Sequence, residues 1–375
     1  MMLQRIYRLE KLIKPNKVLI LYGARRVGKT TVLKDFLEKT SLKYKYDTGE
    51  NIRIQQLFLS HTLKDIIEFA EGYQLIAIDE AQQIPNIGIG LKLLVDNIKG
   101  IYVIATGSSS FDLAGAVGEP LTGRKRSLVL YPFSQKELLF RFNKFELKEM
   151  LEDLLVFGTY PEVIMAKTKK EKVEVIEELV NSYLLKDILT LDKVKSPKIL
   201  LDLLKLLSFQ VGNLVSLNEL ATQLSIDVKT VDRYLDLLEK TFVIKKITGY
   251  SSNLRKEVTA KAKYYFIDNG IRNGIIRTYN SVENRNDLGI LWENFIVMER
   301  IKKHTYERKI PVSFYFWRTY DGKEIDLIEE REGKLYGYEM KLSEKKIRFP
   351  KEWLKTYKNA KINVINRENY LNYVL

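Results

Sequence analysis

The chain has 375 residues, which is enough for about two or three domains of ordinary size. Its 62 lysine and arginine residues outnumber its 48 aspartate and glutamate residues, so the formal net charge is +14. The absence of cysteine excludes disulfides, thiol nucleophiles and cysteine-ligated zinc or iron–sulfur sites, and two histidines are too few for a histidine-rich metal site. Any metal is therefore expected to be a hard ion with oxygen ligands, such as Mg²⁺.

The positive charge is concentrated in the last part of the chain. Residues 1–240 contain 35 basic and 31 acidic residues, whereas residues 241–375 contain 27 and 17. This imbalance indicates a polyanion partner such as DNA, although a basic surface can also serve solubility alone. The N-terminal sequence lacks the apolar core of a signal peptide, and no apolar run is long enough to span a membrane. We therefore expect a cytoplasmic protein without a membrane partner.

Short apolar runs alternate with helical patterns in the first third of the chain. Buried parallel strands read as continuous apolar runs, so this alternation predicts a doubly wound α/β domain over residues 1–135. The expected strands lie at residues 17–22, 43–47, 74–79, 101–106 and 127–131, and the expected helices at 29–40, 62–71 and 89–98.

A glycine-rich loop joins the first expected strand to the first expected helix. Residues 23–30 read Gly-Ala-Arg-Arg-Val-Gly-Lys-Thr, which fits the phosphate-loop pattern G-x-x-x-x-G-K-[ST]. Glycines let the backbone wrap closely around phosphates, and the amides at a helix start attract negative charge. Lys29 is expected to reach the β- and γ-phosphates and Thr30 to ligate Mg²⁺. The expected ATP-binding residues are Gly23, Ala24, Arg25, Arg26, Val27, Gly28, Lys29, Thr30 and Thr31. The alternative is a glycine-rich turn that matches by chance.

Two acidic residues end the expected strand at 74–79. Asp79 is predicted to support Mg²⁺, and Glu80 to polarise the attacking water as the hydrolytic base. The polar run that follows the next strand supplies a candidate γ-phosphate sensor, Ser108 or Ser109. An additional strand between the loop strand and the Asp79 strand is typical of the catalytic-glutamate class of P-loop ATPases. A solvated acidic turn and an ordinary strand-to-helix turn are the alternatives.

The pattern becomes helical after residue 135. Helical spacing over 172–191 and 196–207 predicts a helical lid or linker at residues 136–210. Residues 211–284 are predicted to be a winged helix-turn-helix and connector, because helical segments at 217–224 and 228–240 precede a strand at 242–247. The candidate DNA-contacting residues are Lys229, Thr230, Arg233 and Tyr234 in the second helix, followed by Arg255, Lys256, Lys261 and Lys263. Winged helices also bind proteins, and basic faces are often only solvated.

Residues 285–375 combine one helix at 288–303 with expected strands at 312–318, 324–329 and 334–341. Residues 339 and 341 point to the same side of a strand. Two carboxylates can bind Mg²⁺, and a lysine beside a scissile phosphate can stabilise charge or lower the pKa of a water. The candidate catalytic residues are Asp326, Glu339 and Lys341, with Asp326 and Glu339 as metal ligands and Glu293 as a further acid. The alternative is an exposed hairpin with ordinary charges. The aromatic residues Phe314, Phe316, Trp317 and Tyr320 are expected mainly to form core.

Several motifs together carry a family resemblance. They are the loop at 23–30, Ile-Asp-Glu-Ala-Gln at 78–82, Ala-Thr-Gly-Ser-Ser at 105–109, Leu-Thr-Gly-Arg at 121–124 and Tyr-Pro-Phe-Ser at 131–134. The last is the D…E-x-K pattern formed by Asp326, Glu339 and Lys341. The chain resembles the AAA-type ATPases of archaea and bacteria that carry an uncharacterised C-terminal restriction-endonuclease-like domain. The resemblance implies an α/β P-loop ATPase core of the additional-strand class, a helical and winged-helix region, and a small α/β nuclease-like domain.

The resemblance also implies how subunits cooperate. Arg124 or Arg126 would act as an arginine finger on a neighbouring subunit or as a phosphate sensor; a basic surface turn is the alternative. Action on a neighbouring subunit would require a homo-oligomer. We therefore expect a Mg²⁺-dependent ATPase that acts on DNA through the winged helix and the basic nuclease-like domain. The alternative is an ATP-dependent regulatory scaffold that binds protein partners and whose nuclease-like domain is inactive.

Overall fold

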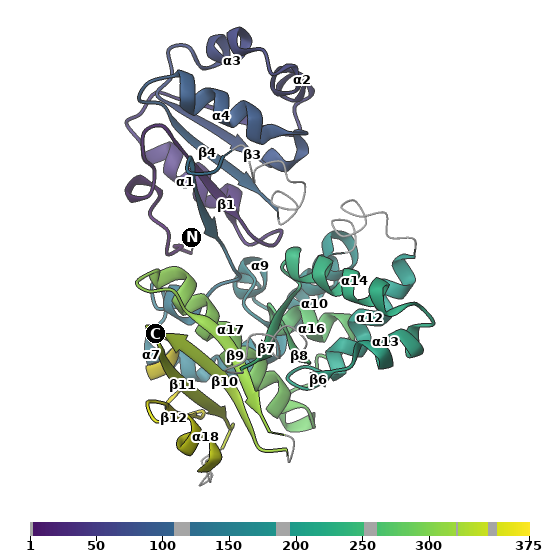
Figure 1. The fold of residues 1–375 in the computed structure, drawn as a ribbon. Coiled ribbons are helices and arrows are strands. Elements are labelled where there is room, and N and C mark those ends of the chain that lie inside the picture. The colour runs from purple at the N-terminus through teal and green to yellow at the C-terminus, as the bar shows by residue number, and fades with distance from the viewer. Residues whose placement is uncertain (1–2, 109–120, 185–195, 251–260, 320–321, 344–350) are drawn as a thin grey trace.

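The computed structural model describes residues 3–108, 121–184, 196–250, 261–319, 322–343 and 351–375. Figure 1 shows two bodies, each built around its own sheet: an upper body in purple and blue, and a lower body formed by the rest of the chain. None of the helices in these ranges combines the length and the apolar character that crossing a membrane requires.

The upper body contains a five-stranded parallel sheet. Its strand order is β2-β3-β4-β1-β5, so β4 is the additional strand that the sequence predicts between β1 and β3. Every residue of β3 is buried, which is why this strand reads as a continuous apolar run. The strands are β1 (Lys17–Tyr22), β2 (Tyr44–Thr48), β3 (Leu75–Asp79), β4 (Tyr102–Gly107) and β5 (Lys125–Val129).

Helices cover both faces of this sheet. Because side chains alternate along a strand, Leu19 and Leu21 of β1 pack into the cluster that contains α1, whereas Val18 and Ile20 pack into the cluster with the other helices. The elements are α1 (Lys29–Lys39), α2 (Ile52–Ser60), α3 (Leu63–Ala70), the 3-10 turn η2 (Ala81–Gln83) and α4 (Ile87–Asn97). This arrangement is the doubly wound α/β fold that the alternation of strands and helices predicts.

The lower body contains a seven-stranded mixed sheet of order β12-β11-β10-β9-β7-β8-β6. Its two halves meet where β7 runs parallel to β9, with Thr248 opposite Tyr315 and Gly249 opposite Phe316. The sequence-based boundary at 284/285 therefore separates segments whose strands share one sheet. The strands are β6 (Leu214–Val215), β7 (Ile244–Gly249), β8 (Ala262–Phe266), β9 (Ser313–Arg318), β10 (Glu324–Arg331), β11 (Lys334–Met340) and β12 (Lys361–Ile365).

The helices of the lower body begin at well-defined caps. Asp227 caps α14 by accepting a hydrogen bond from the Thr230 amide at 2.8 Å, and Ser216 caps α13 through the Glu219 amide. Those of the first half are α6 (Gln135–Leu138), α7 (Lys144–Glu149), α8 (Leu151–Phe157), α9 (Pro161–Met165), α10 (Lys169–Glu178), the π-helical turn η3 (Leu179–Leu184), α12 (Pro197–Phe209), α13 (Leu217–Leu224) and α14 (Val228–Lys240). Those of the second half are α16 (Asn269–Ile275), α17 (Leu288–Glu307), α18 (Lys351–Thr356) and α19 (Tyr370–Val374).

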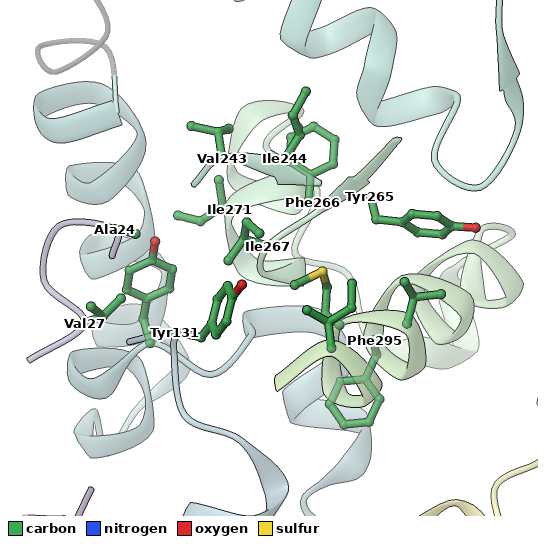
Figure 2. Close-up of a cluster of buried hydrophobic side chains, with 14 of the residues drawn as sticks. Ala24, Val27, Tyr131, Val243, Ile244, Tyr265, Phe266, Ile267, Ile271 and Phe295 are labelled. Carbon is green, nitrogen blue, oxygen red and sulfur yellow. The ribbon is translucent and has the colours of Figure 1, made fainter. Parts of the chain in front are cut away.

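An apolar cluster joins the two bodies at the phosphate loop. Figure 2 shows Ala24 and Val27 of the loop beside Tyr131, in the same cluster as side chains of β7, β8 and α17. The ring of Phe242, in the turn before β7, lies 5.9 Å from that of Tyr22 and 6.0 Å from that of Tyr131, measured between ring centroids. The end of β1 therefore packs directly against the lower body.

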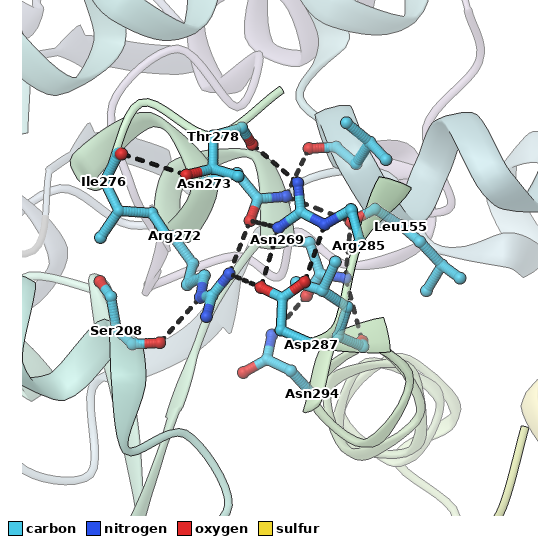
Figure 3. Close-up of polar contacts among 12 residues, drawn as sticks. Leu155, Ser208, Asn269, Arg272, Asn273, Ile276, Thr278, Arg285, Asp287 and Asn294 are labelled. Atoms are coloured by element: carbon cyan, nitrogen blue, oxygen red, sulfur yellow. Dashed lines mark hydrogen bonds and ion pairs between the residues drawn. The ribbon is translucent and has the colours of Figure 1, made fainter. Parts of the chain in front are cut away.

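Part of the positive charge in the C-terminal third is buried rather than available to a partner. Figure 3 shows Arg272 and Arg285 sharing the carboxylate of Asp287, with Arg285 also donating to Asn273 at 3.0 Å. Arg272 donates to the Ser208 carbonyl at 2.8 Å, so the network ties α12 to α16. Buried charges need such partners, and these arginines stabilise the fold.

Candidate functional site

The loop at 23–30 has the backbone that a phosphate loop needs. Gly28 has φ of +93°, a conformation that favours glycine, and it immediately precedes the first residue of α1. A Cβ at Gly23 would lie 2.1 Å from the Leu130 carbonyl oxygen, so this position also requires glycine. The free amides at the start of α1 therefore face the loop.

Lys29 holds its ammonium group inside this loop. Its Nζ donates to the carbonyl oxygens of Gly23 and Ala24, both at 2.9 Å, and only 4% of the residue is exposed. The ammonium group is thus already positioned within the cradle that the sequence motif predicts. Thr30 follows it in the first turn of α1 and is partly exposed.

The ends of β3 and β4 place a hydrogen-bonded acidic pair at the same edge. Asp79 accepts hydrogen bonds from the Thr106 hydroxyl and, at 3.3 Å, from the hydroxyl of Tyr46. The amide of Glu80 donates to the Thr106 hydroxyl at 3.3 Å. Burial, together with the charge of Asp79, raises the pKa of Tyr46 to about 12, so Tyr46 stays a donor at neutral pH. The Thr106 hydroxyl is therefore hydrogen-bonded to both Asp79 and Glu80.

These elements border one pocket of about 410 Å³. Lys29, Thr30 and Glu80 all line it, although Glu80 is separated in the sequence from the other two. The other lining residues are Arg25, Arg26, Gly28, Thr31, Glu50, Pro161, Glu162 and Met165. The Thr30 hydroxyl and the Asp79 carboxylate are the oxygen donors that Mg²⁺ prefers, so the residues present fit this ion.

Two residues that the sequence predicts for this site, Arg124 and Ser108, do not line the pocket of their own chain. Arg124 directly precedes β5, whose first residues lie beside the start of β1, at the end of the sheet opposite the loop. Its guanidinium is 2.5 Å from the carboxylate of Asp96. Ser108 is buried, and its amide donates to the Gln82 side chain at 3.3 Å. Ser109 lies outside the described residues.

Thr106, Tyr46 and Glu162 are among the residues of this site that sequence reasoning missed. Thr106 was identifiable in principle, because the register of the sheet pairs Ile78 with Ala105 and thereby places Asp79 next to Thr106. Glu162 carries no such local signal, since it reaches the pocket only through the packing of α9.

A second constellation forms at the β10–β11 hairpin. The Lys341 ammonium lies 3.5 Å from the Asp326 carboxylate and 3.2 Å from that of Glu339. The register that pairs Leu327 with Tyr338 brings the two carboxylates to neighbouring positions. The structure therefore brings together the three residues of the D…E-x-K pattern.

The charges of this constellation shift the pKa values of two of its members. Burial, together with the charge of Asp326, raises the pKa of Glu339 to about 7. Burial acts to lower the pKa of Lys341, but the charges of Asp326 and Glu339 outweigh it and raise that pKa. No group of three or more histidine, aspartate or glutamate side chains in the described ranges is arranged to hold a metal ion. The pair of carboxylates would have to bind a metal with water or substrate oxygens.

Glu293 faces a buried lysine beside this constellation. It accepts a hydrogen bond from the Tyr265 hydroxyl at 2.8 Å, and its carboxylate lies 3.6 Å from the Lys263 ammonium. Lys263 also pairs with Glu324 and is only 1% exposed. The prediction that Lys263 contacts phosphate is therefore wrong for this conformation, because its ammonium group is enclosed by carboxylates.

The helix-turn-helix segment exposes fewer candidate contacts than the sequence predicts. Lys229 and Arg233 are exposed on α14, on a face that also carries Asp232 and Asp236. Tyr234 is buried in the core, so its predicted DNA contact is wrong. Arg255 and Lys256 lie outside the described residues, as does Tyr320. Phe316 and Trp317 are buried, as expected of core residues.

Three family models match successive parts of the chain. Residues 15–139 match an AAA domain. We call this matching part of the chain the AAA domain. Residues 148–281 match a domain of unknown function, DUF8612, which continues across the sequence-based boundary at 210/211. Residues 288–372 match another domain of unknown function, DUF4143.

Two proteins with similar sequences are described only as uncharacterized. An uncharacterized protein of Mycobacterium tuberculosis is 26% identical over 337 residues, which cover 89% of this chain and 72% of the relative. Another, from Methanocaldococcus jannaschii, is 25% identical over 376 residues, covering 94% of this chain and 81% of the relative. Among solved structures, the replication initiator DnaA bound to AMPPCP and single-stranded DNA is 16% identical and covers 60% of this chain and 83% of its own. Its TM-score of 0.29 is too low to support an argument.

Proposed function

We propose that this chain is a Mg²⁺-dependent ATPase that binds and hydrolyses ATP in the pocket of the AAA domain. The observation that carries this proposal is the convergence of Lys29, Thr30 and Glu80 on one pocket at the carboxyl edge of a parallel sheet. Ligands of open α/β sheets bind at this edge.

Each residue has a role that follows from its position. The loop amides and Lys29 bind the phosphates, and Thr30 and Asp79 would hold Mg²⁺. When bound, Mg²⁺ neutralises charge on the phosphate oxygens. Glu80 accepts a proton from the attacking water, while the hydrogen bonds from Glu80 and Thr106 to Asp79 fix the two acidic residues relative to each other.

The experiment is steady-state ATP turnover with Mg²⁺. Lys29→Ala is expected to lose ATP binding, whereas Glu80→Gln should retain binding and lose turnover by about 10²–10⁴-fold. Lys39→Ala is the matched control, because Lys39 lies on the same helix, is well exposed and pairs only with Asp35 among the ion pairs of the described residues. Equal turnover in all three variants and the wild type would refute the assignment.

We also propose that the β10–β11 constellation is a Mg²⁺-dependent site for phosphodiester cleavage. The convergence of Asp326, Glu339 and Lys341 favours this second function. The test is nicking of plasmid DNA with Mg²⁺ or Mn²⁺, which Asp326→Ala and Lys341→Ala should both abolish. Lys334→Ala, at the exposed start of β11, is the control. Nicking that persists in both site variants would rule out this site.

DNA is the partner we propose for the lower body. Strand β6 lies between α12 and α13, and β7 and β8 follow α14, which is the order of elements in a winged helix. Helix α14 exposes Lys229 and Arg233. Two phosphate contacts would make the affinity for DNA fall with rising salt, and Lys229→Ala with Arg233→Ala should reduce that slope by about 2. Binding without salt dependence would favour the alternative, a scaffold for protein partners with an inactive nuclease-like domain.

The position of Arg124 leads us to propose a homo-oligomer. Since this arginine lies at the sheet end opposite its own loop, it can serve only the pocket of another subunit. Mixing Arg124→Ala with Lys29→Ala should therefore restore part of the ATPase activity that each variant alone lacks. A mixture without activity would argue against a finger supplied by Arg124.

A further inference from the structure

Two carboxylates from outside the AAA domain hold an arginine of the phosphate loop. The guanidinium of Arg26 lies 3.0 Å from the carboxylate of Glu162, in α9, and 2.7 Å from that of Glu178, at the end of α10. Both contacts are also hydrogen bonds, one to each terminal nitrogen of Arg26. The two glutamates therefore occupy the fork that an arginine uses to bind paired oxygens.

The backbone of Arg26 fixes the direction of this side chain. Arg26 has φ of +57°, a left-handed conformation that is uncommon outside glycine, asparagine and aspartate. The loop thus holds Arg26 in a defined conformation, and its guanidinium lies beside α9 and α10 while Lys29 remains inside the cradle. Arg26 and Lys29 therefore have different partners.

The charge of the pocket makes this arrangement relevant to nucleotide binding. Arg25, Arg26 and Lys29 line the pocket together with three glutamates, Glu50, Glu80 and Glu162. A bound nucleoside triphosphate adds several negative charges next to these lining residues. Glu162 would then repel the phosphates, while Arg26 would attract them once it is free of its carboxylates.

We infer that Glu162 and Glu178 set the nucleotide affinity of the AAA domain by competing with phosphate oxygens for Arg26. Without nucleotide the two glutamates hold the guanidinium. When ATP binds, its phosphate oxygens replace them as the partners of Arg26, and the contact between the loop and α9–α10 is lost. This inference rests on the proposed function, because it assumes that the pocket binds ATP.

The segment formed by α9 and α10, which would lose its contact with the loop, is held by hydrogen bonds just before its N-terminal end. Directly before α9, Thr159 accepts a hydrogen bond from Lys302 of α17 at 3.2 Å, and its amide donates to the buried Asp268 at 2.7 Å. Its carbonyl accepts from the Phe133 amide at 2.9 Å. The loosening is therefore expected in α9 and α10, and not in the strand connection before them.

The experiment measures the dissociation constant of ATP by calorimetry with Mg²⁺. Glu162→Gln combined with Glu178→Gln keeps the shape of the side chains and removes both charges. Because exposed ion pairs contribute modestly, we expect about two- to tenfold tighter binding. Glu174→Gln is the matched control, since Glu174 lies on α10, is exposed and pairs with Lys170; it should bind ATP like the wild type.

A double-mutant cycle isolates the arginine. In an Arg26→Ala background, the two glutamine substitutions should change the affinity for ATP much less, because the group for which the carboxylates compete is absent and only the direct repulsion by Glu162 remains. A gain of the same size in that background would overturn the inference, as would unchanged or weaker binding in the Glu162→Gln, Glu178→Gln protein.

Hydrogen exchange gives a readout that needs no substitution of the glutamates. Adding ATP to the Glu80→Gln protein should increase amide exchange in α9 and α10, and unchanged or decreased exchange there would overturn the inference. The Lys29→Ala protein separates the two claims. If it binds ATP like the wild type, the proposed function fails; if it loses binding while the glutamine variants behave as the wild type does, the competition for Arg26 alone fails.

Discussion

One hydroxyl at the end of β4 connects the two acidic residues of the proposed ATPase site. Thr106 donates to the Asp79 carboxylate and accepts from the amide of Glu80. Glu80 itself has φ of +47°, which costs free energy in a residue with a side chain. The hydrogen bond from its amide to Thr106 helps to keep Glu80 in this conformation.

This geometry predicts that Thr106→Val lowers ATP turnover without abolishing ATP binding. The substitution keeps the size of the side chain and removes the hydroxyl, so Asp79 and Glu80 lose their common partner. A small displacement of a catalytic group costs about tenfold to a hundredfold in rate. The measurement is kcat together with the dissociation constant of ATP. Thr106→Ser retains the hydroxyl and should restore most of the rate; a Ser variant as slow as the Val variant would contradict this role.

The sequence predicts those residues of the site whose positions follow from a local pattern in the chain. Lys29 and Thr30 are identifiable because a strand, a loop and a helix in succession place them, and Glu80 is identifiable because it directly follows a buried strand. Glu162 and Arg26 meet only through packing between distant segments, which no local pattern encodes. Tyr234 was misassigned for a related reason, since an amphipathic helix does not reveal which neighbours cover each side.

At the scale of elements, α17 connects the AAA domain to the β9–β12 half of the large sheet. Lys302 of α17 donates to the Phe133 carbonyl at 3.0 Å, just after the AAA sheet. Two residues earlier in the same helix, Arg300 binds Glu329 of β10 through two contacts of 2.6 Å. Helix α17 therefore contacts the end of the AAA domain with one side and the large mixed sheet with the other.

The Arg300–Glu329 pair predicts acid sensitivity. Burial favours the neutral carboxyl, but the hydrogen bond from His304 and the charge of Arg300 outweigh it and lower the pKa of Glu329 from 4.5 to about 2. Between these two pH values the unfolded chain binds more protons than the folded one, so the free energy of unfolding decreases as the pH falls. The contribution is complete above pH 4.5, amounts to about 3 kcal/mol, and is lost near pH 2.

Urea unfolding of Glu329→Gln at several pH values checks this prediction. At pH 7 the variant should be less stable by about 3–5 kcal/mol, because Arg300 is left buried without its counter-charge. Its stability should also depend less on pH between 4.5 and 2 than that of the wild type. Glu332→Gln, in the exposed turn after β10, is the control. Parallel pH profiles of the wild type and Glu329→Gln would contradict the assignment.

At the scale of the whole molecule, the sequence predicts elements better than their assembly. The helices at 217–224 and 228–240 and the C-terminal strands follow from periodicity and capping, which are local. The parallel pairing of Thr248 with Tyr315 is set by tertiary packing between distant segments. For this reason the sequence divides the lower body at 284/285, whereas the sheet joins its two sides.

Arg5 lies where the N-terminal segment, the phosphate loop and α17 meet. Its guanidinium is paired at 2.9 Å with the buried carboxylate of Glu137 and donates to the Val27 carbonyl of the loop at 3.2 Å. It also donates to the Tyr306 hydroxyl of α17 at 3.3 Å, and Tyr306 in turn accepts from the Tyr131 amide at 3.0 Å. A single side chain thus contacts both bodies of the molecule.

We therefore predict that Arg5→Met weakens the coupling between the two bodies. The substitution keeps an apolar stem of similar length, but leaves the Glu137 carboxylate buried without its counter-charge, which costs about 3–5 kcal/mol. Because the lost contacts join the bodies, calorimetry should show the single unfolding transition of the wild type dividing into two, with the AAA domain unfolding separately from the large mixed sheet. Arg8→Met, at an exposed position of the same segment, should leave the transition unchanged. A single transition at the wild-type midpoint in Arg5→Met would show that the apolar cluster around Tyr131 and Phe242 suffices to make the two bodies one cooperative unit.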